Sequence, residues 1–341
     1  MANERNRLLN VLRGEEADRA PCICPGGMMN MVTRDLMELS NVYLPEAHVD
    51  ARKMADLAKA VYDKGCFENY GVPFCMTVEA QDMGAGVDMG STVFEPRVNE
   101  YPIESVSDYK TLKPLDIDAG RGKVVLDAIR ILKEETEGVP VIGNITGPVS
   151  TASSLMEPVH YYKELRRKNK ESHEYMAFIT EQLIQFALAE IDAGADIITI
   201  SDPSGTGEIL GPKLFEEFTV TYINQLLDAI EPTSVPVIVH ICGRMTNVFE
   251  EVNHIHSHAL SFDSIVSVSN AKKNLPGRLI MGNVSTYSLE YGDPQKVSSL
   301  TEACLHAGSD IISPACGIGM RSPIENIRAM HDCVTGQERN R

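Results

Sequence analysis

The sequence is poor in positive charge. Its 341 residues contain 31 lysines and arginines against 48 aspartates and glutamates, which gives a formal net charge of −17. Nucleic acids and anionic membranes are bound through basic surfaces. We therefore expect neither a nucleic acid nor a membrane as the main partner, whereas an enzyme acting on a small molecule is compatible with this charge.

Long apolar runs are also lacking. No stretch approaches the roughly 18 apolar residues of a transmembrane helix. Residues 1–21 have no apolar segment of the signal-peptide type and instead resemble a short amphipathic helix. We expect a cytoplasmic protein, in which the eight cysteines need not form disulfides because the cytosol keeps thiols reduced.

No linker, low-complexity tract or block of like charge divides the chain, so a single domain over residues 1–341 with an N-terminal helical extension is expected. Short apolar strands alternate with helical patterns, which predicts βαβ units and a mainly parallel sheet covered on both faces. An eighth strand is arguable at 72–80 or 88–96, where the pattern looks more like a hairpin or an insertion. The seven clearer strands are expected within 21–24, 139–143, 196–201, 235–239, 259–262, 278–282 and 310–315.

This pattern favours an α/β fold of the (β/α)8 TIM-barrel type, which the chain length also fits. A doubly wound open sheet is the alternative. No G-x-G-x-x-G pattern follows the first strand, so a dinucleotide-binding fold lacks support. Barrel enzymes place their chemistry at the C-terminal ends of the strands, and the residues directly after each apolar run are therefore the candidates for function.

Polar and sulfur-containing side chains follow most of the expected strands. Glu79 and Asp82 lie near the arguable eighth strand. The other candidates, in chain order, are Met28, Met29, Asn30, Asn144, Asp202, His240, Cys242, Asp263, Asn283 and Cys316.

Three of these candidates suggest a metal site. His240 and Cys242 are two residues apart, so their side chains leave the same face of an extended strand. A closed barrel brings Cys316 from another strand end towards them. Two thiolates and one imidazole suit zinc, and three protein ligands leave a fourth position open, as in catalytic sites. The alternative is that all three are core residues, but their position at two glycine-followed strand ends favours the metal.

Other histidines and cysteines carry less signal. His254, His256 and His258 form a cluster that contains no cysteine, on a connection away from the strand C-termini, and we interpret them as solvated residues. Cys22 and Cys24 alternate within the first strand and should be packing residues. The remaining cysteines, Cys66, Cys75, Cys304 and Cys333, fall in patterns that core burial explains.

The motifs VPVIVHICG, IMGNVS and ISPACGIG, followed by SPIENI, resemble those of the corrinoid-dependent methyltransferases of the uroporphyrinogen decarboxylase superfamily. The resemblance runs along nearly the whole chain. It implies a (β/α)8 barrel with zinc bound by His240, Cys242 and Cys316. It also implies that a methyl group moves between a small substrate and a corrinoid (cobalamin) carried by a separate protein. A homodimer is a further assembly that the resemblance allows.

The resemblance leaves the substrate and the direction of transfer open. Coenzyme M methyltransferases tend to carry a Glu-Glu pair after the sixth strand, where this chain has Asp263 as a carboxylate, a candidate fourth ligand or proton acceptor. A methionine-rich wall of Met28 and Met29, with Asn30, would suit an aryl ring. Arg34 and Arg97 are the candidate cations for a sulfonate.

We therefore favour demethylation of an aryl methyl ether, with methylcobalamin:coenzyme M methyl transfer as the alternative. Asp202 is a second catalytic candidate, and Asn144 and Asn283 are candidates for corrinoid contacts. Glu79 and Asp82 are candidates for substrate binding. A decarboxylase is disfavoured because no arginines lie beside the first strand, and a non-catalytic zinc scaffold is disfavoured because it has no use for an open metal position.

Overall fold

The computed structural model describes residues 3–336. A parallel sheet in the order β1-β4-β5-β6-β7-β8 forms most of a barrel wall. Two further segments close the barrel through isolated bridges, which join Cys22 to Ile312, Met281 to Ile311 and Val284 to Pro314. The wall strands are β1 (Tyr70–Val72), β4 (Val141–Thr146), β5 (Ile197–Ser201), β6 (Val237–Ile241), β7 (Ala259–Phe262) and β8 (Leu279–Met281).

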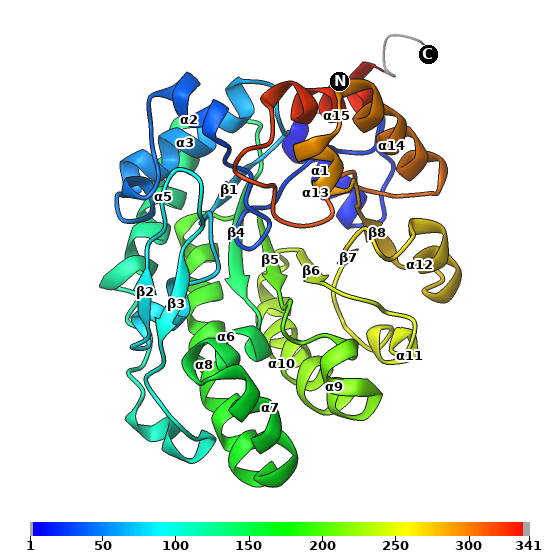
Figure 1. Ribbon diagram of the computed structural model, residues 1–341. Coiled ribbons are helices and arrows are strands. Elements are labelled where there is room, and N and C mark those ends of the chain that lie inside the picture. Colours follow the sequence, from blue (N-terminus) through cyan, green and yellow to red (C-terminus); the bar gives the residue numbers. More distant parts are fainter. Residues whose placement is uncertain (1–2, 337–341) are drawn as a thin grey trace.

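Each wall segment is followed by at least one helix, and the helices surround the barrel (Figure 1). The predicted (β/α)8 fold and its N-terminal helix, α1 (Glu4–Leu12), are confirmed. The principal outer helices are α3 (Ala51–Asp63), α5 (Gly120–Glu135), α8 (Asn169–Ala193), α10 (Thr221–Ile230), α11 (Phe249–Val252), α12 (Val268–Asn274), α14 (Pro294–His306) and α15 (Ile324–Gly336).

Shorter elements lie between the strand ends and these helices. They are α2 (Arg34–Ser40), η1 (Glu46–His48), α4 (Val78–Asp82), η2 (Val106–Thr111), α6 (Pro148–Leu155), α7 (Pro158–Arg167), α9 (Gly207–Leu214), the π-helical η3 (Phe215–Val220), η4 (Glu231–Thr233) and α13 (Thr286–Tyr291).

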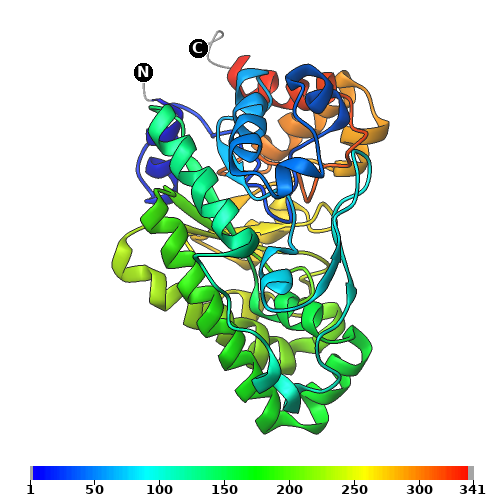
Figure 2. The ribbon, with the colours of Figure 1, turned by 90° about the vertical axis from the view of Figure 1, so that its left-hand side faces the viewer.

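The arguable eighth strand resolves into two different structures. The wall strand is β1, which ends where the expected 72–80 segment begins. Residues 88–96 form most of the tip of an antiparallel hairpin between β2 (Gly86–Asp88) and β3 (Arg97–Glu100), as the hairpin interpretation expected. In Figure 2 this hairpin (cyan) and α1 (dark blue) lie on opposite sides of the view.

The wall strands are almost continuously apolar because both of their faces are covered. Every residue of β4, β5, β6 and β7 is buried, which is the pattern of a sheet lying between a filled interior and a layer of helices. Next to β1 the buried Glu68 joins the first wall segment, because its carboxylate accepts hydrogen bonds from the Cys22 backbone N–H (2.8 Å) and from Arg19. No helix within residues 3–336 has both the length and the apolar character needed to cross a membrane.

Candidate metal centre

The three predicted ligands converge at one end of the barrel. His240 lies in β6, Cys242 follows that strand directly, and Cys316 follows the wall segment around Ile312. Their ligand atoms all lie within 4.8 Å of one another. The Nε2 atom of His240 is 3.2 Å from Cys242 Sγ, and the two sulfurs are 3.8 Å apart. The chain folds so that strand ends far apart in sequence present these three side chains to one point.

A glycine after each cysteine allows this convergence. Gly243 has a φ of +85°, and a Cβ there would lie 2.6 Å from Thr206 Oγ1. A Cβ on Gly317 would lie 2.6 Å from the backbone oxygen of Met28. A side chain at either position would push the neighbouring segment away, so close packing explains why a glycine follows each of the two cysteines.

The donor set fits zinc in type and in spacing. Zinc is bound by thiolate sulfur at about 2.3 Å and by imidazole nitrogen at about 2.0–2.1 Å, and two sulfurs at a tetrahedral angle are then about 3.8 Å apart. The observed Sγ–Sγ separation of 3.8 Å meets this requirement without rearrangement. His240 is fully buried, whereas both cysteines are partly exposed, so a fourth position can be reached from the barrel mouth.

The two cysteines share their protons unequally. A hydrogen bond from Cys242 lowers the pKa of Cys316, with further help from His240. The same bond, together with burial, raises the pKa of Cys242. The pair therefore loses one proton readily, and a cation that replaces the second proton stabilises both thiolates.

Two carboxylates flank the centre. Asp263 directly follows β7 and is partly exposed; its Oδ1 accepts the Ile265 N–H at 2.9 Å, and its charge raises the pKa of Cys242. Asp263 is not among the residues whose ligand atoms group with the two sulfurs. Glu95, at the tip of the β2–β3 hairpin, was missed by sequence reasoning. One of its oxygens lies 3.8 Å from the Cβ position of Gly317.

Glu95 has an unusual environment for a hairpin residue. Its side chain keeps contact with solvent, yet neighbouring protein limits the hydration of the carboxylate. This desolvation, with the nearby thiols of Cys75 and Cys316, raises the pKa of Glu95 to about 7. The only sequence signal was a carboxylate in an insertion that follows a wall strand.

Asp202, the second catalytic candidate, is occupied in holding a helix. Its carboxylate is fully buried and accepts hydrogen bonds from Ser150 Oγ (2.6 Å), Ser150 N–H (2.8 Å) and Val149 N–H (3.1 Å) in the first turn of α6. Burial raises the pKa of Asp202 to about 6. These contacts indicate a structural role, and the geometry does not support Asp202 as a catalytic residue.

The two asparagines proposed for corrinoid contacts also hold backbone segments together. Asn144 is buried, and its Nδ2 donates to the carbonyls of Pro25 (2.8 Å) and Val72 (2.9 Å). Asn283 donates from Nδ2 to the carbonyls of Asp263 (3.0 Å) and Val266 (2.7 Å). Asn144 thus fixes the first wall segment inside the barrel, and Asn283 fixes the loop after β7.

The substrate-binding candidates of the first wall segment differ in their surroundings. Asn30 is buried, and its side-chain amide exchanges hydrogen bonds with the backbone N–H and carbonyl of Val32. The backbone of Met28 packs against Gly317, next to the candidate metal centre. Met29, in contrast, is fully buried in the core and cannot form the expected pocket wall.

Glu79 and Asp82 likewise make structural contacts. Glu79 is buried, where desolvation raises its pKa, and it accepts hydrogen bonds from the N–H (2.6 Å) and Oγ1 (2.9 Å) of Thr146. Asp82 accepts the N–H groups of Arg121 (3.0 Å) and Gly122 (2.7 Å) at the start of α5. Neither carboxylate groups with the metal-ligand atoms.

Cys75 is buried as expected but lies in polar company that the sequence did not reveal. Its Sγ is 2.9 Å from Arg121 Nη2 and 3.4 Å from Thr77 Oγ1. Burial opposes ionisation of this thiol, but the Arg121 charge and hydrogen bonds from His48 and Thr77 outweigh it and lower the pKa of Cys75 to about 5. The result is a buried thiolate–guanidinium pair after β1.

The histidine cluster is not a metal site among the described residues. His254 bonds to Glu216, His256 to Asp228, and His258 accepts the Val237 N–H through Nδ1 at 3.1 Å. The candidate sulfonate cations are likewise engaged elsewhere: Arg34 pairs with Glu38 and Arg97 with Asp88, all on the exposed surface.

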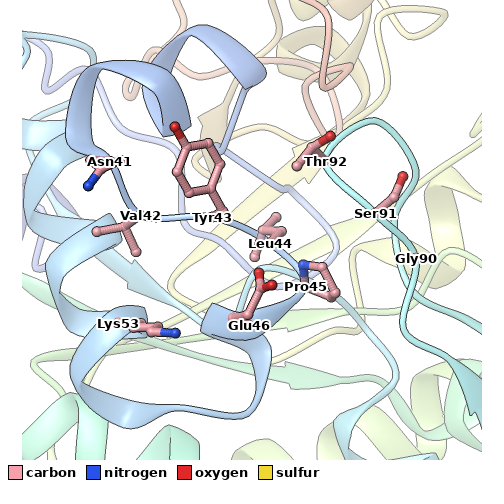
Figure 3. Close-up of a pocket in the computed structure, with 10 residues that line it drawn as sticks. All are labelled: Asn41, Val42, Tyr43, Leu44, Pro45, Glu46, Lys53, Gly90, Ser91 and Thr92. Atoms are coloured by element: carbon pink, nitrogen blue, oxygen red, sulfur yellow. The ribbon is translucent and has the colours of Figure 1, made fainter.

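A pocket of about 540 Å³ opens beside the hairpin (Figure 3). Residues 41–46 and Lys53 line one side, and residues 90–92 line the other. Both segments follow wall strands, so the pocket belongs to the same end of the barrel as the metal centre. None of the three metal-ligand candidates lines it.

Comparisons with known proteins agree with this architecture. The family model for uroporphyrinogen decarboxylase matches residues 3–337. The methylcobamide:CoM methyltransferase MtbA of Methanosarcina acetivorans is 31% identical over 97% of both chains. The methylcobamide:CoM methyltransferase MtaA of Methanosarcina barkeri is 30% identical over 96% of both chains. A solved methyltransferase structure from Methanosarcina mazei superposes with a TM-score of 0.92 at 28% identity, covering 99% of this chain and 100% of the other.

These relatives confirm the predicted resemblance to corrinoid-dependent methyltransferases and the enzyme class, methyltransferase. They do not support the preference for an aryl methyl ether, because the relatives named here are methylcobamide:CoM methyltransferases. The burial of Met29 removes part of the structural reason for that preference. The alternative, transfer to a thiol, fits the relatives better.

Proposed function

The chain belongs to the uroporphyrinogen decarboxylase family, and from this premise we propose that it transfers a methyl group from a methylated corrinoid to a thiol bound at the metal centre. The observation that carries the proposal is the convergence of His240, Cys242 and Cys316 with a sulfur–sulfur distance of 3.8 Å. The methylcobamide:CoM methyltransferase relatives, matched over nearly their full length, support the same reaction class and make coenzyme M the first thiol to test.

His240, Cys242 and Cys316 would hold the zinc. Zinc at this position would lower the pKa of a bound thiol, which would make the sulfur a nucleophile near neutral pH. The partial exposure of both cysteines lets a thiol enter from the barrel mouth. The corrinoid would be carried by a separate protein that docks at this end, since the sulfur must reach the methyl group on cobalt.

The transfer requires an acceptor for one proton. The thiol sulfur forms a bond to the methyl carbon, both electrons of the cobalt–carbon bond stay on cobalt, and the thiol proton is released. We propose Asp263 as the acceptor, because its charge is felt by the Cys242 thiol and its side chain is partly exposed. Its Oδ1 is engaged by the Ile265 N–H, so we assign the proton to Oδ2.

The experiment compares the two directions of transfer in one protein preparation. Zinc-loaded protein is mixed with methylcobalamin and coenzyme M, and loss of the methylcobalamin absorbance is followed. In parallel, it is mixed with cob(I)alamin and a panel of methoxylated aromatics. We expect turnover in the first mixture alone. Formation of methylcobalamin from an ether, with no reaction of any thiol, would restore the aryl ether reading.

A matched pair of variants links the activity to the site. Cys316→Ser should lose zinc and methyl transfer, because a neutral hydroxyl replaces a thiolate ligand. Cys333→Ser, which alters a partly exposed cysteine on α15, should keep both. A Cys316→Ser protein with full metal content and full activity would refute the assigned centre.

A further inference from the structure

The imidazole of His240 lies between two buried serines. Ser201 in β5 and Ser261 in β7 are the register partners of His240 in β6. The strands β5 and β7 are the two neighbours of β6 in the barrel wall (Figure 1). Residues in register on adjacent parallel strands point to the same face, so all three side chains enter the barrel interior at one level. None of the three is more than 2% exposed.

The two serines differ in what they contact. Ser261 Oγ is 2.9 Å from His240 Nδ1. Ser201 Oγ is equally buried, yet it has no hydrogen-bond partner among the described residues. The strand on one side of the ring thus supplies a hydrogen bond, and the strand on the other side supplies only a side chain of the same size.

The contact with Ser261 determines which nitrogen is available to a metal. The other ring nitrogen, Nε2, is the atom near the cysteine pair, 3.2 Å from Cys242 Sγ. A neutral imidazole carries one proton, and a nitrogen that binds a metal must be free of it. If Nδ1 donates its proton to Ser261 Oγ, Nε2 presents its lone pair towards Cys242 and Cys316.

We propose that Ser261 is a positioning residue, which fixes the tautomer and the orientation of His240 so that Nε2 faces the metal site. This inference rests on the proposed function in that it assumes a metal at the three ligands. Partners that accept the second N–H of a ligating histidine typically change metal affinity 10–100-fold when they are removed. A serine that merely filled space would have no such effect.

The test measures zinc affinity by competition with a chromophoric chelator in four proteins. Ser261→Ala should bind zinc 10–100-fold more weakly than the wild type. Ser261→Thr, which keeps a hydroxyl on Cβ, should restore most of the affinity. Ser201→Ala removes the partnerless hydroxyl from the same level and should leave affinity unchanged. Equal affinities of Ser261→Ala and Ser201→Ala would overturn the proposal.

A second measurement needs no variant. In zinc-loaded wild-type protein labelled with ¹⁵N-histidine, the His240 ring should show a protonated Nδ1 and a metal-bound Nε2. A metal-bound Nδ1 would refute the role of Ser261 while leaving the proposed methyl transfer intact. Failure of the wild type to bind zinc would instead refute the metal centre itself, so the two failures are distinguishable.

Discussion

Replacing Glu190 should stabilise the protein, and the gain should grow as the pH rises. Glu190 lies on α8 and is fully buried against β4, where a Cβ on Gly143 would be 2.3 Å from its Oε2. The backbone of Asn144 is nearby, but neither carboxylate oxygen makes a hydrogen bond of normal geometry to the described residues. Burial raises the pKa of Glu190 well above its ordinary value.

The magnitude follows from proton linkage. Between the unfolded pKa, about 4.3, and the raised folded pKa, the folded state holds a proton that the unfolded state has released. The stability due to this proton is complete below the unfolded pKa and is lost as the pH rises towards the folded pKa. Within this interval the loss is about 1.4 kcal/mol for each pH unit.

Urea unfolding of Glu190→Gln and Glu190→Leu at several pH values tests this reasoning. Both variants should lack the part of the pH-dependent loss that Glu190 causes. Glu190→Leu should gain a further 1–3 kcal/mol or so, because it also removes a buried polar group without partners, less the loss from imperfect packing. Glu181→Gln, at an exposed position on the same helix, should follow the wild type. Parallel stability curves for wild type and Glu190→Gln would refute the reasoning.

Two further perturbations concern the barrel mouth. Gly317→Ala places a Cβ 2.6 Å from the Met28 carbonyl oxygen. Zinc affinity, measured by chelator competition, should therefore fall tenfold or more although every ligand is retained. Gly336→Ala adds a Cβ that meets nothing within 4 Å, and it should leave the zinc affinity unchanged. In urea unfolding, Cys75→Ser should cost more stability at pH 8 than at pH 5. A thiol whose pKa is lowered to about 5 in the folded protein contributes stability at high pH, and this stability is lost as the pH falls. A cost that does not change with pH would contradict the ionisation of Cys75 in the folded protein.

The barrel and the clustering of His240, Cys242 and Cys316 could be predicted because their signals are local. Apolar runs of strand length marked the wall, and the i, i+2 spacing of His240 and Cys242 placed both side chains on one face. The strand-end rule of barrel enzymes then brought in Cys316. These steps need only the order of residues along the chain.

The roles of other strand-end residues depend on register and on partners distant in sequence. Ser201 is the register partner of His240 and faces inward, so Asp202 must face outward, where it meets α6. The sequence predicted that the Asn144 amide could bind a corrinoid, but in the structure its Nδ2 donates to the carbonyls of Pro25 and Val72. No sequence pattern reports such tertiary hydrogen bonds.

The hairpin residue Glu95 and the Cys75–Arg121 pair were missed for a related reason. Glu95 belongs to an insertion whose return towards Gly317 is set by tertiary packing. Arg121 reaches Cys75 from a helix 46 residues further along the chain. An apolar sequence context predicted the burial of Cys75 but not the cation beside it.

The central claim is that one metal at His240, Cys242 and Cys316 carries the methyl transfer. Metal-free protein should therefore be titrated with zinc while the rate of methylcobalamin consumption in the presence of coenzyme M is recorded. We expect a negligible rate without metal and a linear rise that ends at one zinc per chain. A full rate in metal-free protein, or no rate at any zinc content, would contradict it.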